Sequence, residues 1–376
     1  MKKLAAALFA LALLLTGCTG ESDAGHAPTA APTAAVEPSA APAMTKYSTV
    51  FMDTFDTVIQ VIGYAESEAV FSTYANQVYG SYLYMHKLFD NYNSYEDEGI
   101  VSVYTLNQRA AQEPVKVDPI LFHLLDFCRK NYGQCRGQVN IAMGSVLSIW
   151  HDYREAGLNS PEQAQLPPMD ELTAAAAHTD INNLILDEEN MTVFFADPSM
   201  KLDVGAAAKG YATEIAAKLL LDSELSSFII SAGGNVRVGN PPRDGRANWG
   251  VGIQDPDGSV LGTSDIIETL FLSNKSVVTS GDYQRFYTVD GVNYHHLIDP
   301  DTLMPSTEYR SVSIITEDSG YADLLSTTAF LMPYEESRTF IESLDGVEAI
   351  WVFPDMHIEM TDGAKPYAKS QGAANK

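Results

Sequence analysis

The sequence predicts an α+β protein in which mostly antiparallel sheets pack with helices, in a single large domain of two intimate lobes. Hairpins dominate over regular strand–helix–strand units, and the clearest is Asp290-Gly291 between the apolar segments 285–289 and 292–298. The segment 206–221 has an apolar residue every third or fourth position, which indicates an amphipathic helix. Strands joined as hairpins beside such helices favour the α+β class.

The other elements follow from the same periodicities, with strands alternating and helices repeating every three to four residues. In the first half we expect helices at 66–89, 119–132 and 145–153, and strands at 54–62, 192–196 and 200–203. The second half predicts a helix at 321–331, stopped by Pro333, and strands at 228–231, 250–254, 267–272, 276–279, 311–316 and 347–353. A Pro-rich connection covers 160–170.

The N-terminus has the pattern of a lipoprotein. Residues 1–17 carry two lysines and a short apolar run typical of a signal peptide, and small residues precede Cys18, the predicted lipidation site. An ordinary signal peptide with an incidental cysteine is the alternative. Residues 18–46 are rich in Ala, Pro and Thr and predict a disordered tether, 47–367 the folded domain and 368–376 a disordered tail. We therefore expect an extracytoplasmic protein anchored to the cell membrane through lipidated Cys18.

A formal net charge of −26 argues against a nucleic-acid-binding surface. It also means that an anionic substrate needs a local counter-charge, either a metal ion or a well-placed lysine. Cys128 and Cys135 could form one disulfide or remain buried thiols, and the cysteine spacing matches no zinc site.

The first candidate motif runs from Asp203 through a series of small residues to Lys209 and Gly210. Small residues let a ligand approach the backbone, and the free N–H groups of a helix start suit an anion. Lys209 lies in the first turn, where the helix dipole disfavours a cation. A bound phosphate or carboxylate would offset this unfavourable interaction. A capping Asp203 with a solvated lysine is the alternative.

The second candidate motif places Asp323, Ser326 and Thr327 on one face of the helix at 321–331. One carboxylate with hydroxyls offers hard oxygen ligands, and phosphate oxygens could complete the shell of Mg²⁺. Alternatively, these are a helix cap and hydroxyls bonded back to their own helix.

The third candidate motif combines 279–283 with His295 and His296. Adjacent strand residues point to opposite faces, so only one histidine can face a site. There it could act as a general base on a hydroxyl, whereas a hydrogen-bonded structural histidine is the alternative.

These segments together resemble the ApbE family of FAD:protein FMN transferases over about residues 51–332. Residues 52–54 (Met-Asp-Thr) are similar to its Met-Gly-Thr, 137–140 (Gly-Gln-Val-Asn) to Gly-Ala-Phe-Asp, 203–210 to Asp-Leu-Gly-Gly-Ile-Ala-Lys-Gly, and 231–235 (Ser-Ala-Gly-Gly-Asn) to Asn-Ala-Gly-Gly-Asp. The segments 280–283 (Ser-Gly-Asp-Tyr), 296–300 (His-Leu-Ile-Asp-Pro) and 322–327, with Ala-Asp and Ser-Thr, complete the resemblance.

The resemblance implies a role for each matching residue. FAD as substrate would be contacted by Met52, Tyr95, Gln138, Val139, Asn140, Asp203, Lys209 and Leu297. Mg²⁺ would be held by Asp323, Thr327 and the main-chain carbonyl of Ala206, and His296 would be the base. Tyr92 competes with Tyr95 for the position that stacks on adenine. Asp53, Asn140 and Ala206 depart from the family pattern, which has Gly, Asp and Gly there.

The implied activity is Mg²⁺-dependent cleavage of FAD, with FMN attached to a threonine hydroxyl of a target flavoprotein and AMP released. The acceptor would be a membrane redox subunit or a secreted flavoprotein. A metal-dependent FAD pyrophosphatase would use the same site with water as nucleophile. A lipid-anchored flavin-binding protein without catalysis is an alternative of another class, and it would not need both His296 and Asp323.

Overall fold

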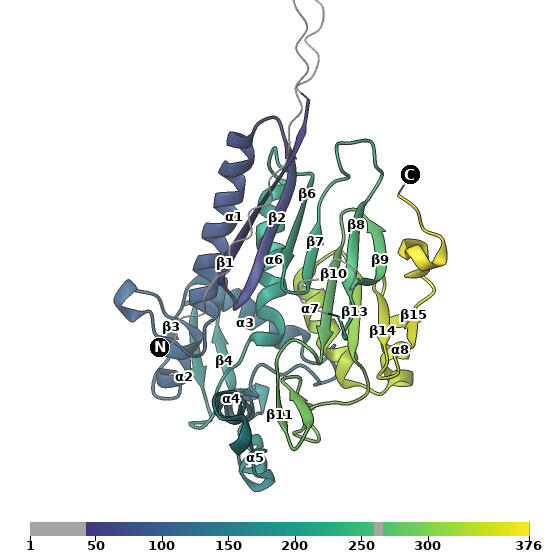
Figure 1. Cartoon of the computed structure of the whole chain (residues 1–376). Helices are drawn as coiled ribbons and strands as arrows, with labels where there is room; N and C mark the ends of the chain where they lie inside the picture. Colours follow the sequence, from purple (N-terminus) through teal and green to yellow (C-terminus); the bar gives the residue numbers. More distant parts are fainter. Residues whose placement is uncertain (1–42, 259–265, 376) are drawn as a thin grey trace, which may run out of the picture. The chain divides into compact units, whose positions relative to one another are not determined.

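An eight-stranded antiparallel sheet runs through the middle of the protein (Figure 1). Its order is β1 (Thr45–Thr54), β2 (Thr57–Ala65), β6 (Phe228–Ala232), β7 (Asn235–Val238), β10 (Ser276–Gly281), β13 (Ser311–Thr316), β14 (Glu348–Val352) and β15 (Ile358–Met360). The computed structural model describes residues 43–375 except 259–265. The predicted signal peptide, Cys18 and nearly all of the tether therefore lie outside the described residues, and the last two tether residues belong to β1.

Three helices cover one face of this sheet, namely α1 (Glu68–Phe89), α6 (Gly205–Leu221) and α7 (Ser319–Leu331) (Figure 1). α6 lies between α1 and α7, and α7 packs on β10 and β13. The predicted apolar stripe of α6 is confirmed where Ala212, Ala216 and Leu220 are fully buried. α3 (Pro119–Asn131) packs against α1 and α6, and α8 (Tyr334–Glu342) against α7 and β14.

The opposite face is covered by the hairpin of β8 (Trp249–Gln254) and β9 (Ile266–Leu272) with two short 3₁₀ turns, η4 (Lys365–Tyr367) and η5 (Lys369–Gln371). This corrects the prediction of a disordered tail. Ala368 is fully buried and bridges Leu270 of β9, and Asn375 exchanges hydrogen bonds with the backbone of Asn248. Backbone pairing and amide bonds order this tail, although it has few large apolar residues.

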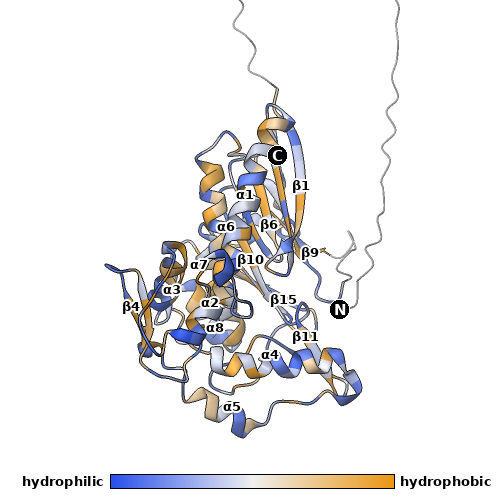
Figure 2. Cartoon of the chain, turned by 90° about the vertical axis from the view of Figure 1, so that its left-hand side faces the viewer, coloured by the Kyte–Doolittle hydropathy of each residue, from blue (hydrophilic) through white to orange (hydrophobic). Residues whose placement is uncertain are grey.

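A smaller cluster packs α4 (Gly144–Asn159) and α5 (Met169–Ala176) with the hairpin of β11 (Phe286–Val289) and β12 (Val292–His295); Figure 2 shows them at one end of the molecule. The predicted hairpin is confirmed, since Asp290 and Gly291 have φ of 48° and 81°. The remaining elements are η1 (Glu96–Glu98), α2 (Val103–Arg109), β3 (Val115–Lys116), η2 (Pro161–Gln163), η3 (Ile181–Asn183), β4 (Leu184–Asp187) and β5 (Thr192–Phe195).

Two predicted strands are wrong in detail. The strand expected at 54–62 is broken by a tight turn at Phe55 and Asp56, whose φ values are 54° and 50°. The segment 200–203 forms no strand, because the Asn107 side chain bonds both the N–H and the carbonyl of Leu202. The α+β class itself is confirmed, and the described residues from Ala43 onward form one compact unit.

Within the described part of the chain, no helix combines the length and the apolar character that crossing a membrane would require.

Candidate functional site

The first two motifs meet where the starts of α6 and α7 touch. A Cβ on Gly210 of α6 would lie 2.3 Å from the carbonyl oxygen of Ser319 and 2.4 Å from Cβ of Asp323, so only glycine allows this approach. The Gly210 N–H donates to Oδ2 of Asp323 at 2.7 Å. In a regular helix the partner of that N–H is the carbonyl oxygen of Ala206, and here the Asp323 carboxylate accepts from it as well.

Asp323 is a buried carboxylate, with 5% of its surface exposed. Burial raises the pKa of Asp323, while Lys209, the Gly210 N–H and the Asn235 side chain lower it. A carboxylate that has lost water and gained these partners is poised to bind a cation.

Hydroxyl groups from α7 and β10 meet on the face of α7 that carries this carboxylate. Oγ of Ser280, at the end of β10, lies 2.8 Å from Oγ of Ser326 and 3.2 Å from Oγ1 of Thr327. Ser326 also bonds back to the carbonyl of Asp323, and Asp318 caps α7, so the structural alternative for this motif holds as well. The metal-site and helix-capping interpretations are compatible, because Thr327 shares the face of α7 that carries Asp323.

The described residues contain no group of three or more His, Cys, Asp or Glu side chains that could cage a metal. The α6–α7 contact instead offers one carboxylate, the Thr327 hydroxyl and the Ala206 carbonyl, all hard oxygen donors. Mg²⁺ commonly takes one or two carboxylates and completes its shell with water and phosphate oxygens, so these residues fit that ion.

The two adjacent histidines have different environments, as strand geometry predicts. Nε2 of His295 lies 2.6 Å from the carbonyl of Ser306, while its Nδ1 accepts from the N–H of Leu297. His295 is therefore the structural histidine, with both nitrogens used inside the fold. Nδ1 of His296 lies 3.2 Å from the carbonyl of Arg285, which can only accept, so Nδ1 carries the proton and Nε2 keeps its lone pair.

The charge state of His296 follows from its neighbours. Burial, then Arg285, Lys209 and His295, lower the pKa of His296 to about 3, against a small opposing effect of the Arg285 carbonyl. Its imidazole is therefore neutral at physiological pH and can accept a proton at Nε2. Lys209 acts on both Asp323 and His296, and so links the three motifs.

Asp203 closes the start of α6. Its Oδ1 accepts from the N–H of Gly205 at 2.8 Å, and its Oδ2 accepts from Nδ2 of Asn91 at 3.0 Å. Tyr92 is about half exposed beside it and stacks on His151, with ring centroids 4.2 Å apart. Burial and the charge of Asp203 raise the pKa of Tyr92 to about 12.

Tyr95, the residue preferred from the sequence, is held differently. Its hydroxyl donates to Oδ2 of Asp90 at 2.8 Å, and Nζ of Lys87 lies 5.5 Å from its ring centroid. The structure thus places Tyr92, and not Tyr95, against Asp203. Flavin contact by either ring stays a prediction.

The loop 138–140 is partly bonded within the fold. Asn140 donates one N–H to the carbonyl of Thr179 and accepts from the N–H of Ala142, so its second N–H can still meet a ligand. Val139 is buried, and Oε1 of Gln138 is buried with no hydrogen-bond partner among the described residues.

Leu297 and Met52 are the two remaining residues that were predicted to contact FAD. Leu297 is buried beside His296, whereas Met52 is 74% exposed near the end of β1. For both residues, contact with FAD stays a prediction.

A family model described as the ApbE family matches residues 55–351. The chain belongs to the ApbE family. It is 34% identical over 271 residues to the FAD:protein FMN transferase of Treponema pallidum (strain Nichols), covering 69% of this chain and 72% of that protein. The corresponding protein of Klebsiella pneumoniae (strain 342) is 29% identical over 273 residues, covering 71% and 81%.

Solved ApbE structures have the same fold. The ApbE protein of Thermotoga maritima MSB8 superposes with a TM-score of 0.74 at 27% identity, covering 86% of this chain and 99% of that one. The flavin transferase ApbE from Vibrio cholerae gives 0.70 at 21% identity, covering 86% and 99%, which supports the fold alone.

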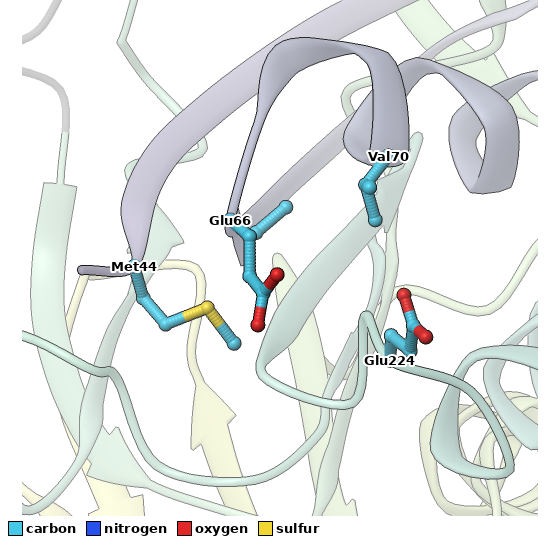
Figure 3. Close-up of a pocket in the computed structure, with 5 residues that line it drawn as sticks. Met44, Glu66, Val70 and Glu224 are labelled. Carbon is cyan, nitrogen blue, oxygen red and sulfur yellow. The ribbon is translucent and has the colours of Figure 1, made fainter. Parts of the chain in front are cut away.

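Two hollows in this ApbE-family chain are lined by no residue of α6 or α7. One is bordered by Met44, Ala65, Glu66, Val70 and Glu224, at the end of β2 opposite the turn Phe55–Asp56 (Figure 3). The other lies on the His295 side of the β11–β12 hairpin and includes Asp282, which pairs with Arg310.

The two cysteines of the domain are free thiols. Cys128 and Cys135 are buried, and burial raises the pKa of both. Of the two alternatives left open by the sequence, a disulfide or buried thiols, the structure has the buried thiols.

Four residues of the site were missed or given no role from the sequence, namely Asn91, Asn235, Ser280 and Arg285. Ser280 and Asn235 lie in segments that resemble family motifs, which was the available signal. Asn91 and Arg285 lie in turns, and the sequence carried no signal for the contact of Asn91 with Asp203 or of Arg285 with His296.

Proposed function

We propose that this chain transfers FMN from FAD to a hydroxyl group of another protein and releases AMP. The observation that carries the proposal is a neutral histidine whose Nε2 keeps its lone pair, together with a lysine whose charge acts on both this histidine and the buried Asp323 carboxylate. A hydroxyl nucleophile needs a base, and a cleaved diphosphate needs positive charge around it. Family membership and the relatives' names support the same activity.

The residues divide the chemistry between them. Nε2 of His296 takes the proton of an acceptor threonine, whose oxygen forms a bond to the FMN phosphorus. The bond from that phosphorus to the bridging oxygen breaks, and AMP leaves with that oxygen. Lys209 and the start of α6 stabilise the negative charge of the diphosphate.

Mg²⁺ is the metal that we propose for this site, held by Asp323, Thr327 and the Ala206 carbonyl. When bound, it supplies positive charge to the diphosphate oxygens. Gly210 and Ser280 position these ligands from α6 and β10.

For FAD itself, the proposed contacts are those that the motifs indicate, namely Met52, Gln138, Val139, Asn140, Asp203, Lys209 and Leu297. We propose Tyr92 as the aromatic ring that packs on the nucleotide. Its ring is half exposed beside Asp203, whereas the Tyr95 hydroxyl is engaged by Asp90.

The cellular setting is also a proposal. A lipid on Cys18 would anchor the enzyme outside the cytoplasm, and residues 19–42 would let it reach acceptors at the membrane. A membrane redox subunit or a secreted flavoprotein bearing the target threonine fits that location. The strongly acidic chain gives no reason to expect nucleic acid as a partner.

The test uses a chain beginning at Ala43, where the compact unit starts, with FAD, Mg²⁺ and a threonine-bearing flavinylation-site peptide. AMP release and peptide mass are followed together, with Asp323→Asn and a chelator as controls. The proposal expects a mass gain of FMN less water, lost in both controls. AMP and free FMN without a mass gain would indicate the pyrophosphatase, and bound but intact FAD the non-catalytic binder.

A further inference from the structure

Arg285 touches the base of the site through its main chain. It lies just before β11, and its carbonyl oxygen is 3.2 Å from Nδ1 of His296. This contact fixes the tautomer of His296 and needs no side chain from residue 285. Substitution of the arginine therefore leaves the orientation of the base intact.

The guanidinium of Arg285 is held only loosely. Its Nη2 lies 3.4 Å from the carbonyl of Phe55 and 3.9 Å from Oδ2 of Asp56. The side chains of Arg285 and Asp56 are 45% and 87% exposed. A long contact between exposed charges contributes little, so the guanidinium is free to take a better partner.

The positive charge of the same guanidinium acts on two site residues. It is the second cause, after burial, of the low pKa of His296, with Lys209 and His295 as the other charged or titratable neighbours. It also acts on Tyr92, which faces Asp203 and Arg154. Arg285 and Lys209 therefore both act on the base with positive charge, in a chain of net charge −26.

Two cations beside a general base weaken that base, because they oppose its protonation. The arrangement makes chemical sense when an anion binds between them, since the anion cancels their effect. The diphosphate of FAD is such an anion, and a guanidinium matches phosphate oxygens with paired N–H groups.

We propose that Arg285 is a second phosphate-binding residue, whose guanidinium moves from the Phe55 carbonyl onto the diphosphate while its own carbonyl keeps His296 oriented. The proposal rests on FAD as the substrate. Binding of the diphosphate then neutralises Arg285 and Lys209 together. His296 becomes a stronger base when substrate is present.

The experiment measures FAD affinity by flavin fluorescence for wild type, Arg285→Gln, Arg285→Lys and Arg243→Gln. Chelator is present, so that FAD is bound without being cleaved. Arg243→Gln is the matched control, because it also removes one arginine charge, but next to Asp244, which accepts a hydrogen bond from Tyr64. Tyr64 lies about 23 Å along β2 from Thr57, the residue that follows the turn contacting Arg285.

We expect Arg285→Gln to weaken FAD binding roughly tenfold or more at low salt, with Arg285→Lys intermediate and Arg243→Gln unchanged. The loss should shrink as salt is raised, because screening already weakens the ion pair in the wild type. A packing defect would instead be independent of salt. Arg285→Gln binding as tightly as Arg243→Gln, or an equal loss at every salt concentration, would overturn the proposal.

This test is separate from that of the transferase activity. If wild type binds FAD but releases no AMP with Mg²⁺, the proposed transferase activity is refuted. The effect of Arg285 on FAD affinity is measured in either case.

Discussion

Replacing Gly210 by alanine tests the contact between α6 and α7 on which the site depends. The new Cβ would lie 2.3 Å from the Ser319 carbonyl oxygen and 2.4 Å from Cβ of Asp323, both on α7. Relief of these contacts requires a shift of about 1 Å, since non-bonded heavy atoms normally stay about 3.5 Å apart. Overpacking of this kind costs about 1–3 kcal/mol, and the helix propensity of alanine returns about 1 kcal/mol.

We therefore expect Gly210→Ala to lose up to about 2 kcal/mol of unfolding free energy. AMP release should fall more steeply, by about a hundredfold, because a 1 Å displacement of Asp323 moves a proposed metal ligand. Denaturant unfolding and an AMP-release assay measure the two effects on the same preparations.

Gly80 provides the matched control within α1. A Cβ there would meet nothing within 4 Å, so Gly80→Ala should stabilise the protein by about 0.5–1 kcal/mol and leave the activity unchanged. If Gly210→Ala instead behaved like Gly80→Ala in both assays, the account of the helix contact and of Asp323 would be refuted.

Three further predictions concern the charged and thiol groups. Asp323→Asn should abolish AMP release yet be at least as stable as wild type without metal, because burial penalises the carboxylate; a clearly less stable variant in denaturant unfolding would contradict this. His296→Gln should lower kcat by about 10²–10⁴. In wild type, the unfolding free energy should fall as the pH drops from 6.5 towards 3, because His296 is protonated in the unfolded chain but stays neutral in the folded one, where its pKa is about 3. His296→Gln should make this fall less steep. An unchanged slope would count against the low pKa of His296. Cys128 and Cys135 should resist alkylation in the native protein and both react after unfolding, as mass spectrometry would show; rapid native labelling would contradict their burial.

Strong local signals made much of the fold predictable. α6 and α7 have the apolar spacing of buried helices, and Asp290-Gly291 supplies the positive φ angles of a tight hairpin. The turn at Phe55 and Asp56 has the same kind of backbone without glycine, and the strand prediction therefore ran across it. The tail after residue 367 was missed because its order comes from contacts with β9 and Asn248, which no local pattern encodes.

The site was predictable as a set of motifs but not as a geometry. Strand alternation separated His295 from His296, and helix periodicity put Asp323 and Thr327 on one face. The N–H of Gly210 on Asp323 and the Arg285 carbonyl on His296 join elements 113 and 11 residues apart. Such contacts depend on how α6, α7 and the hairpin pack, and a one-dimensional pattern does not specify that packing.

The most direct test of the central claim is the ratio of AMP released to FMN attached. Wild type is incubated with FAD, Mg²⁺ and a flavinylation-site peptide, or with the same peptide carrying alanine in place of its threonine. Our account predicts one FMN on the threonine peptide for each AMP, no mass gain on the alanine peptide, and loss of attachment in His296→Gln. AMP released at the same rate with either peptide, and no FMN on the threonine, would contradict the account.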